Sequence, residues 1–154
     1  MKINTVLLFL IFPCINLGYS KDLRDGSIAC NYVNPKSFNN DNRYPTILFE
    51  FDSSMLTKSA STLLDTIVAH LKANPQSIAI LHGYCSSEGT AAHNMRLARD
   101  RAYSVKTYLV NAGINSSRVK LKAHGETSPV ANNSTEKGRE LNRRVEVEET
   151  QLNK

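Results

Sequence analysis

The sequence contains no tryptophan, and only 7% of its 154 residues are aromatic, which counts against a carbohydrate cleft lined by aromatic rings. It has no dense lysine and arginine tract interleaved with aromatic residues, so a nucleic-acid-binding surface is not indicated. Three cysteines are too few for a small domain held together by several disulfides. Hydrophobic residues make up 41% and charged residues 21% of the chain, as in an ordinary globular protein with room for a single domain.

The first 20 residues have the order of features of a secretory signal peptide. Lys2 supplies a positive start, an apolar run covers 6–13, and residues 18–20 (Gly-Tyr-Ser) form a small-residue exit. The run is far shorter than the ~20 apolar residues of a membrane span, so an uncleaved anchor is the weaker alternative. Acylation of Cys14, as in a bacterial lipoprotein, is disfavoured because residues 11–13 are not small. We expect export, and no stable membrane span in the mature chain.

Removal of this segment takes away one basic residue and leaves 18 basic and 14 acidic residues, a net charge of +4. It also leaves two cysteines, Cys30 and Cys85. In an oxidising compartment an even pair indicates one disulfide, Cys30–Cys85, although spacing alone leaves two free thiols open. Residues 21–43 are polar and rich in asparagine, which predicts a loosely ordered lead-in. The folded domain is expected over 44–150.

Hydrophobic periodicity predicts four strands and two long helices in this domain. The strands are expected at 46–51, at 77–82, around Val119–Leu121 and around Val145–Val147, and the helices at 58–73 and from about Leu97 to Asn111. In the first strand, Ile47, Phe49 and Phe51 are expected to open the core, and 125–138 is expected to be mostly loop. The predicted fold is α/β, a two-layer sandwich with both helices on one face of a small mixed four-stranded sheet.

Four short motifs follow one another along the chain. They are 51–54 (Phe-Asp-Ser-Ser) before the first helix, 83–90 (Gly-Tyr-Cys-Ser-Ser-Glu-Gly-Thr) with Asn94 and Arg101 downstream, Gly113-Ile114 with Arg118 leading to Gly125-Glu126, and 138–145 (Gly-Arg-Glu-Leu-Asn-Arg-Arg-Val). With these motifs in order, residues 44–149 resemble the OmpA-like domain family, whose members bind peptidoglycan in the bacterial periplasm.

The resemblance implies non-covalent binding of the diaminopimelate in peptidoglycan stem peptides, without catalysis or a cofactor. This ligand offers a carboxylate and an ammonium on one short side chain. Arg101 matches the family's arginine, whose planar fork suits a carboxylate. Asn94 matches the asparagine at the start of the second helix, Asp52 lies in the first motif, and Arg143 and Arg144 match the paired arginines before the last strand.

Plainer interpretations of the same residues stay open at this point. By pattern alone, Arg101 is an ordinary solvated helix arginine, and Asn94 is an N-cap. One of Arg143 and Arg144 could simply brace the end of the sheet.

The sequence departs from the family at the second half of the ligand site. Where the family usually has an aspartate, this chain has Ser86, and Tyr84 and Cys85 replace the usual histidine and threonine. A hydroxyl accepts a hydrogen bond from an ammonium but brings no charge, which is expected to cost roughly 1–2 kcal/mol of affinity. Glu88 supplies the missing charge if the loop folds back. The alternative function is an OmpA-like fold with a degenerate site that acts as a protein-interaction module of an envelope complex.

Other chemistries are weakly supported. The spacing of His82, Cys85, Glu88 and His93 fits no closed zinc pattern, and no oriented base or lowered thiol pKa is evident for a cysteine enzyme. No nucleophile elbow or other triad signature is present either. We therefore expect no enzyme and no metal, and a periplasmic protein, in association with the outer membrane, whose partners are peptidoglycan and other envelope proteins.

Overall fold

The computed structural model describes residues 43–151; the predicted signal peptide and all but the last residue of the predicted lead-in lie outside this range. Within it, the elements in chain order are β1 (Ile47–Leu48), α1 (Lys58–Ala73), β2 (Ser77–Tyr84), α2 (Ala91–Asn111), a 3₁₀ turn (Ser116–Arg118), β3 (Val119–Gly125), α3 (Glu136–Asn142) and β4 (Arg144–Gln151). No helix among these residues is both long and apolar enough to cross a membrane.

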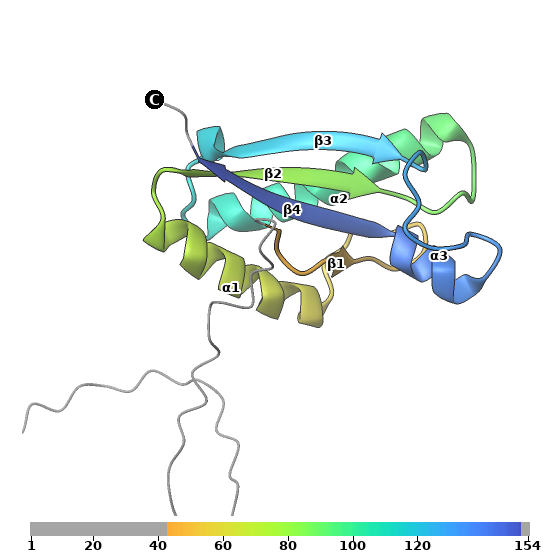
Figure 1. Cartoon of the computed structure of the whole chain (residues 1–154), viewed down its shortest axis with the longest axis horizontal. Helices are drawn as coiled ribbons and strands as arrows, with labels where there is room; N and C mark the ends of the chain where they lie inside the picture. The colour runs from red at the N-terminus through yellow and green to blue at the C-terminus, as the bar shows by residue number, and fades with distance from the viewer. Residues whose placement is uncertain (1–42, 152–154) are drawn as a thin grey trace, which may run out of the picture. The chain divides into compact units, whose positions relative to one another are not determined.

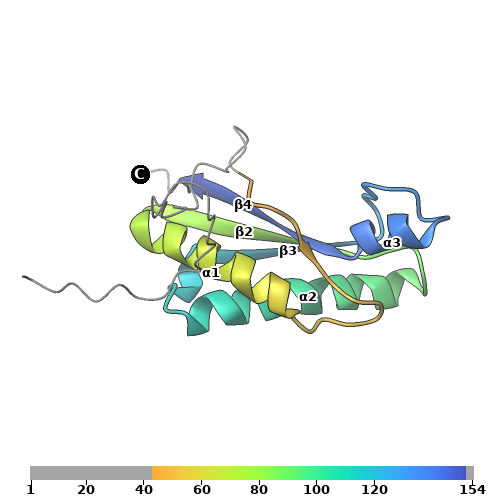
Figure 2. The same cartoon turned by 90° about the horizontal axis from the view of Figure 1, so that it is seen from below.

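The four strands form one mixed sheet in the order β1-β4-β2-β3 (Figure 1). β2 and β3 are parallel, while β4 pairs antiparallel with both β2 and β1. Leu81 of β2 lies opposite Leu121 of β3 and Val147 of β4, which fixes the register across the centre of the sheet. The long helices α1 and α2 cover one face of the sheet (Figure 2). The predicted fold class is therefore confirmed.

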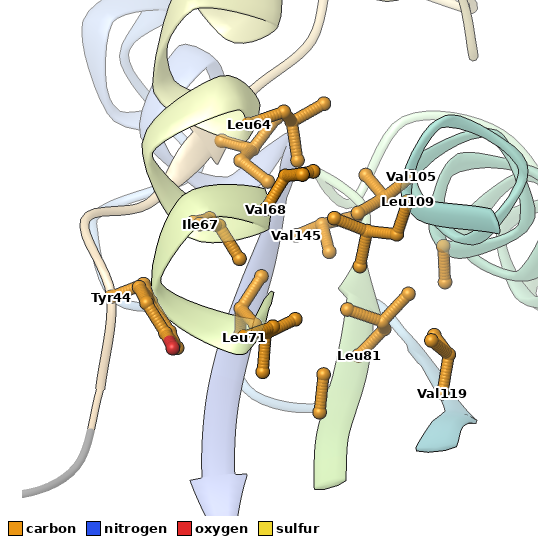
Figure 3. Packing of buried hydrophobic residues seen from close by; sticks show 14 of the residues in the cluster. Tyr44, Leu64, Ile67, Val68, Leu71, Leu81, Val105, Leu109, Val119 and Val145 are labelled. Atoms are coloured by element: carbon orange, nitrogen blue, oxygen red, sulfur yellow. The ribbon is translucent and has the colours of Figure 1, made fainter. Parts of the chain in front are cut away.

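The core lies between the two long helices and the sheet, as Figure 3 shows. Leu64, Ile67 and Leu71 of α1 are fully buried, in agreement with the predicted helical spacing. Val145 of β4 lies on the facing side of the sheet. Burial of each large aliphatic side chain contributes about 1.5–3 kcal/mol, so this layer supplies much of the driving force for folding.

Gly83 brings β2 and α2 unusually close together. A Cβ atom at this position would lie 2.0 Å from the backbone oxygen of Ala98 and 3.3 Å from the Cβ of Ala102. Only glycine permits this approach, because any side chain would push the helix off the strand. The contact places the middle of α2, and with it Arg101, directly beside the end of β2.

The first strand is shorter than predicted. β1 covers only Ile47–Leu48, and Phe51, which was expected in the core, is 62% exposed. The chain leaves the sheet after Phe49, whose N–H donates to the backbone oxygen of Arg143. It then turns at Asp52, where φ is +46°. The alternation of apolar and polar residues thus extends further along the chain than the backbone hydrogen bonds that pair β1 with β4.

α3 (Glu136–Asn142) lies partly in a stretch that was expected to be loop. Thr135 caps the helix, because its hydroxyl accepts the N–H of Gly138. At the other end, the side chain of Asn142 accepts hydrogen bonds from the N–H groups of Val130 and Ala131. The helix is therefore held by polar contacts and has no apolar repeat that would have revealed it.

Candidate functional site

Arg101 is completely buried at the centre of the predicted site. Its guanidinium donates from Nε to the carbonyl of Ser53 (2.8 Å), from Nη1 to the carbonyl of Tyr84 (3.1 Å) and from Nη2 to the carbonyl of Glu50 (3.0 Å). Nη1 also donates to Cys85 Sγ (3.3 Å). The interpretation as a solvated helix arginine is therefore wrong. Arg101 ties the 50–53 turn and the end of β2 to α2.

These contacts occupy most of the hydrogen-bonding capacity of Arg101. A guanidinium has five N–H donors, and the four hydrogen bonds leave one N–H, on Nη2. Burial lowers the pKa of Arg101 below its ordinary value, and the nearby Arg143 adds to the effect. One N–H of Arg101 is therefore left without an acceptor among the described residues.

Cys85 fills the space between Arg101 and the first turns of α2. Its side chain is buried, and its thiol donates to the backbone oxygen of Asn94 at 3.2 Å. Burial raises the pKa of the thiol, which keeps it protonated at neutral pH. The structure has Cys85 as a free thiol. Its predicted disulfide partner, Cys30, lies outside the described residues, so the pairing stays a prediction.

The loop after β2 folds back on itself, which is the condition under which Glu88 was expected to supply the missing charge. Ser86 is buried, and its hydroxyl donates to Glu88 Oε2 at 2.9 Å. Glu88 also lies 3.3 Å from Arg139 Nε and 3.6 Å from Arg143 Nη1. The glutamate carboxylate therefore lies beside Ser86, where the family usually has a charged side chain.

α3 and the residue after it supply a charge cluster that holds Glu88. Glu136 pairs with Arg143 Nη2 at 2.9 Å and with Arg139, whose Nε lies 3.0 Å away. Hydrogen bonds from Arg143 and Arg139 lower the pKa of Glu136 below its ordinary value. Arg139 was not singled out from the sequence, although it lies in the fourth motif. We call Ser86, Glu88, Arg101, Glu136, Arg139 and Arg143 the arginine cluster.

Arg143 has unused hydrogen-bonding capacity. Only 5% of its side chain is exposed, yet within residues 43–151 its Nε and Nη1 have no hydrogen-bond partner. The residue also borders a hollow of about 430 Å³. This hollow is further lined by the 46–50 segment, by Thr57, Ser59, Ala60 and Leu63 at the start of α1, and by Glu140. Buried donors without acceptors are costly, so Arg143 favours an incoming carboxylate.

Asn94 does not cap α2, which corrects one of the interpretations left open. The cap is Thr90, whose hydroxyl accepts the N–H of His93 at 3.2 Å. Asn94 is buried one turn further on, and its amide donates to the carboxylate of Glu126. Asn94 thus links α2 to the loop after β3.

Asp52 and Arg144 lie at the margins of the site. Asp52 is exposed on the turn after β1 and pairs with His93 Nε2 at 2.8 Å. Arg144 opens β4 with its guanidinium 3.8 Å above the ring of Tyr84, and it donates to Glu146. Side chains alternate along a strand, so Arg144 faces away from the helices, whereas Val145 faces the core. The structure therefore brings Arg101, Ser86, Glu88 and Arg143 together and leaves Arg144 outside the cluster.

The chemistry of the arginine cluster is that of an anion site. Three arginines, Arg101, Arg139 and Arg143, stand against two glutamates, Glu88 and Glu136. Among residues 43–151, no three His, Cys, Asp or Glu side chains are arranged to hold a metal ion. The Nε and Nη1 donors of Arg143, which lack a hydrogen-bond partner among the described residues, suit a carboxylate ligand.

Comparisons with known proteins point in one direction. The family model described as the OmpA family matches residues 48–143. Outer membrane protein A of Bordetella avium is 42% identical over 100 residues, covering 65% of this chain and 52% of that protein. The peptidoglycan-associated lipoprotein of Pseudomonas putida is 39% identical over 102 residues, covering 66% of this chain and 61% of that protein. The chain thus spans only about half to three fifths of these two relatives.

A solved structure shows the same fold. The peptidoglycan-associated lipoprotein from Burkholderia pseudomallei superposes with a TM-score of 0.66 at 27% sequence identity. The match covers 68% of this chain and 89% of that chain. The arrangement of sheet and helices described above is therefore that of a known envelope domain.

Proposed function

Because the chain belongs to the OmpA family, we propose that its domain binds peptidoglycan without covalent attachment and tethers it within the cell envelope. Two of the relatives above are named as peptidoglycan-associated lipoproteins. The observation that carries the proposal is the arginine cluster, in which two buried nitrogen atoms of Arg143, Nε and Nη1, have no hydrogen-bond partner among the described residues. Diaminopimelate in the stem peptides provides a carboxylate that these donors fit.

In the proposed complex, the ligand carboxylate enters between Arg101 and Arg143. Arg143 offers its Nε and Nη1 groups, and Arg101 offers its remaining Nη2 hydrogen. Ser86 and Glu88 form the opposite wall, and Asn94 holds the loop after β3 in place through Glu126. Asp52 and Arg144 lie at the rim of the proposed site. Binding of this kind needs no bond breaking, so the proposal includes no catalytic activity.

The proposed location is the periplasm, with association to the outer membrane. Residues 1–20 act as a cleaved signal peptide and residues 21–43 lead into the domain at 44–150 in this proposal. A lipid anchor at Cys14 is not part of it. An intact-mass measurement of exported protein tests the assignment, because cleavage near Ser20 and acylation of Cys14 give different masses.

The proposed disulfide between Cys30 and Cys85 would tie the lead-in to the domain. It requires the buried Cys85 thiol to leave its contacts with Asn94 and Arg101. Thiol counting under denaturing conditions tests it in freshly exported protein. Two reactive thiols would show that the disulfide is absent, and no reactive thiol would support it.

The function is tested by cosedimentation of the purified exported chain with sacculi. Binding that free diaminopimelate competes away supports the proposal. The alternative, a protein-interaction module of an envelope complex, draws its support from Ser86 in place of a charged residue. Retention of a periplasmic protein partner with no sedimentation on sacculi would favour that alternative.

A further inference from the structure

The negative charge of the arginine cluster is already matched by positive charge. Glu88 and Glu136 are each shared between Arg139 and Arg143, and Arg101 lies within the electrostatic reach of Arg143. A ligand ammonium beside Glu88 would therefore find no carboxylate charge that is still unmatched.

Four carboxylates around the loop after β2 are already engaged. Glu88 accepts the Ser86 hydroxyl and pairs with two arginines, and Glu136 is shared between the same two. Asp52 pairs with His93, and Glu126 accepts the amide of Asn94. Glu50 and Glu140 line the hollow beside Arg143, whose lining does not include Ser86. An ammonium beside Ser86 would find a neutral hydroxyl and a carboxylate whose charge is already balanced.

The unused groups of the cluster are donors. Arg143 has Nε and Nη1 without partners in a side chain that is 5% exposed, and Arg101 keeps one N–H on Nη2. Nη1 of Arg143 lies 3.6 Å from Glu88, which is beyond hydrogen-bond distance. A carboxylate would satisfy these donors, whereas an amine would satisfy none of them.

We propose that this site recognises the carboxylate of diaminopimelate and that its affinity does not depend on the charge of the neighbouring amine. It then accepts stem peptides whose diaminopimelate amine is acylated, as in the cross-links of the wall, as readily as stems whose amine is free. This inference rests on the proposed function, and it adds to it the class of stem peptide that is bound.

The test uses two synthetic stem tripeptides that are identical except for the side-chain amine of diaminopimelate, which is free in one and acetylated in the other. Calorimetric titration of the full exported chain should give dissociation constants within threefold of each other. A change of more than threefold in either direction on acetylation would overturn the inference and leave the proposed function standing. Absence of binding to both peptides would overturn the proposed function and the inference with it.

Two variants give the comparison its internal control. Ser86→Asp places a full negative charge in the loop and should create a preference of about tenfold for the free amine. Ser87→Asp adds the same charge one residue further on, at an exposed position, and should create none. Equal discrimination by both variants would contradict the assignment of Ser86 to the amine side of the site. Ser86→Ala, which should bind both peptides equally, serves if Ser86→Asp does not fold.

Discussion

The hydroxyl of Ser86 donates a 2.9 Å hydrogen bond to the carboxylate of Glu88, two residues further along the same loop. This contact places a negative charge beside Ser86, where the family usually carries an aspartate. Arg139 and Arg143 already pair with Glu88. The carboxylate is therefore less available to a ligand ammonium than an unpaired aspartate would be. The chain thus keeps a carboxylate at this position, and two arginines balance its charge.

Arg101→Ala is expected to destabilise the domain strongly. The substitution removes the donors from three backbone carbonyls, those of Glu50, Ser53 and Tyr84, and opens a cavity at a fully buried position. We expect a loss of about 3 kcal/mol in the free energy of unfolding, measured by urea titration. Arg99→Ala, at an exposed position on the same helix, should stay within about 0.5 kcal/mol of the wild type. Equal stability of the two variants would contradict the structural role of Arg101.

Glu136→Gln is expected to lower the melting temperature at pH 7. Hydrogen bonds from Arg143 and Arg139 hold the pKa of Glu136 below its unfolded value. The contribution of Glu136 to stability is therefore present at pH values above its pKa in the unfolded chain. It is lost as the pH falls through its pKa in the folded protein. The difference from the wild type should shrink below pH 4. Glu140→Gln, also exposed on α3, is the control, and an equally large effect there would refute the assignment.

His124→Phe is expected to reduce the acid sensitivity of the domain. Burial, together with the charges of His82 and Lys122, lowers the pKa of His124 below its ordinary value. The folded state then takes up a proton less readily than the unfolded state, so stability falls as the pH drops below about 6.5. Phenylalanine can retain the stacking on Tyr84, where the ring centroids are 4.7 Å apart, but cannot titrate. An unchanged slope of melting temperature between pH 7.5 and 5.5 would exclude His124 as a cause.

Gly83→Ala is expected to destabilise the contact between β2 and α2. The added Cβ would lie 2.0 Å from the backbone oxygen of Ala98, which is part of the helix and cannot rotate away. Overpacking of this kind typically costs about 1–3 kcal/mol, and thermal unfolding measures it. A melting temperature equal to that of the wild type would show that α2 is not held against the strand as described.

The first long helix was predicted with both its ends, because its apolar residues repeat at helical spacing. Leu64, Ile67 and Leu71 all face the core, and Pro75 follows the end of the helix. α3 lacked such a signal. It is held by the hydroxyl of Thr135 and the amide of Asn142, and these contacts depend on loop geometry that periodicity does not encode.

Motif resemblance singled out Ser86, Glu88, Arg101 and Arg143 of the arginine cluster, but their environments could not be predicted. The burial of Arg101 depends on backbone carbonyls at positions 50, 53 and 84, which only the folded chain brings around the helix. Likewise, Arg139 becomes part of the site only because α3 faces the 85–90 loop. Spacing along the sequence gives residue identities, whereas these contacts arise from tertiary packing.

The most direct test of the central claim is a calorimetric titration of the exported chain with a diaminopimelate-containing stem tripeptide, with Arg143→Gln measured beside the wild type. The wild type should bind the peptide saturably, and Arg143→Gln should bind it at least tenfold more weakly. Circular dichroism should show that both proteins are folded. Equal affinity for the two proteins, or no binding to the wild type, would contradict the claim that the arginine cluster binds the peptidoglycan stem.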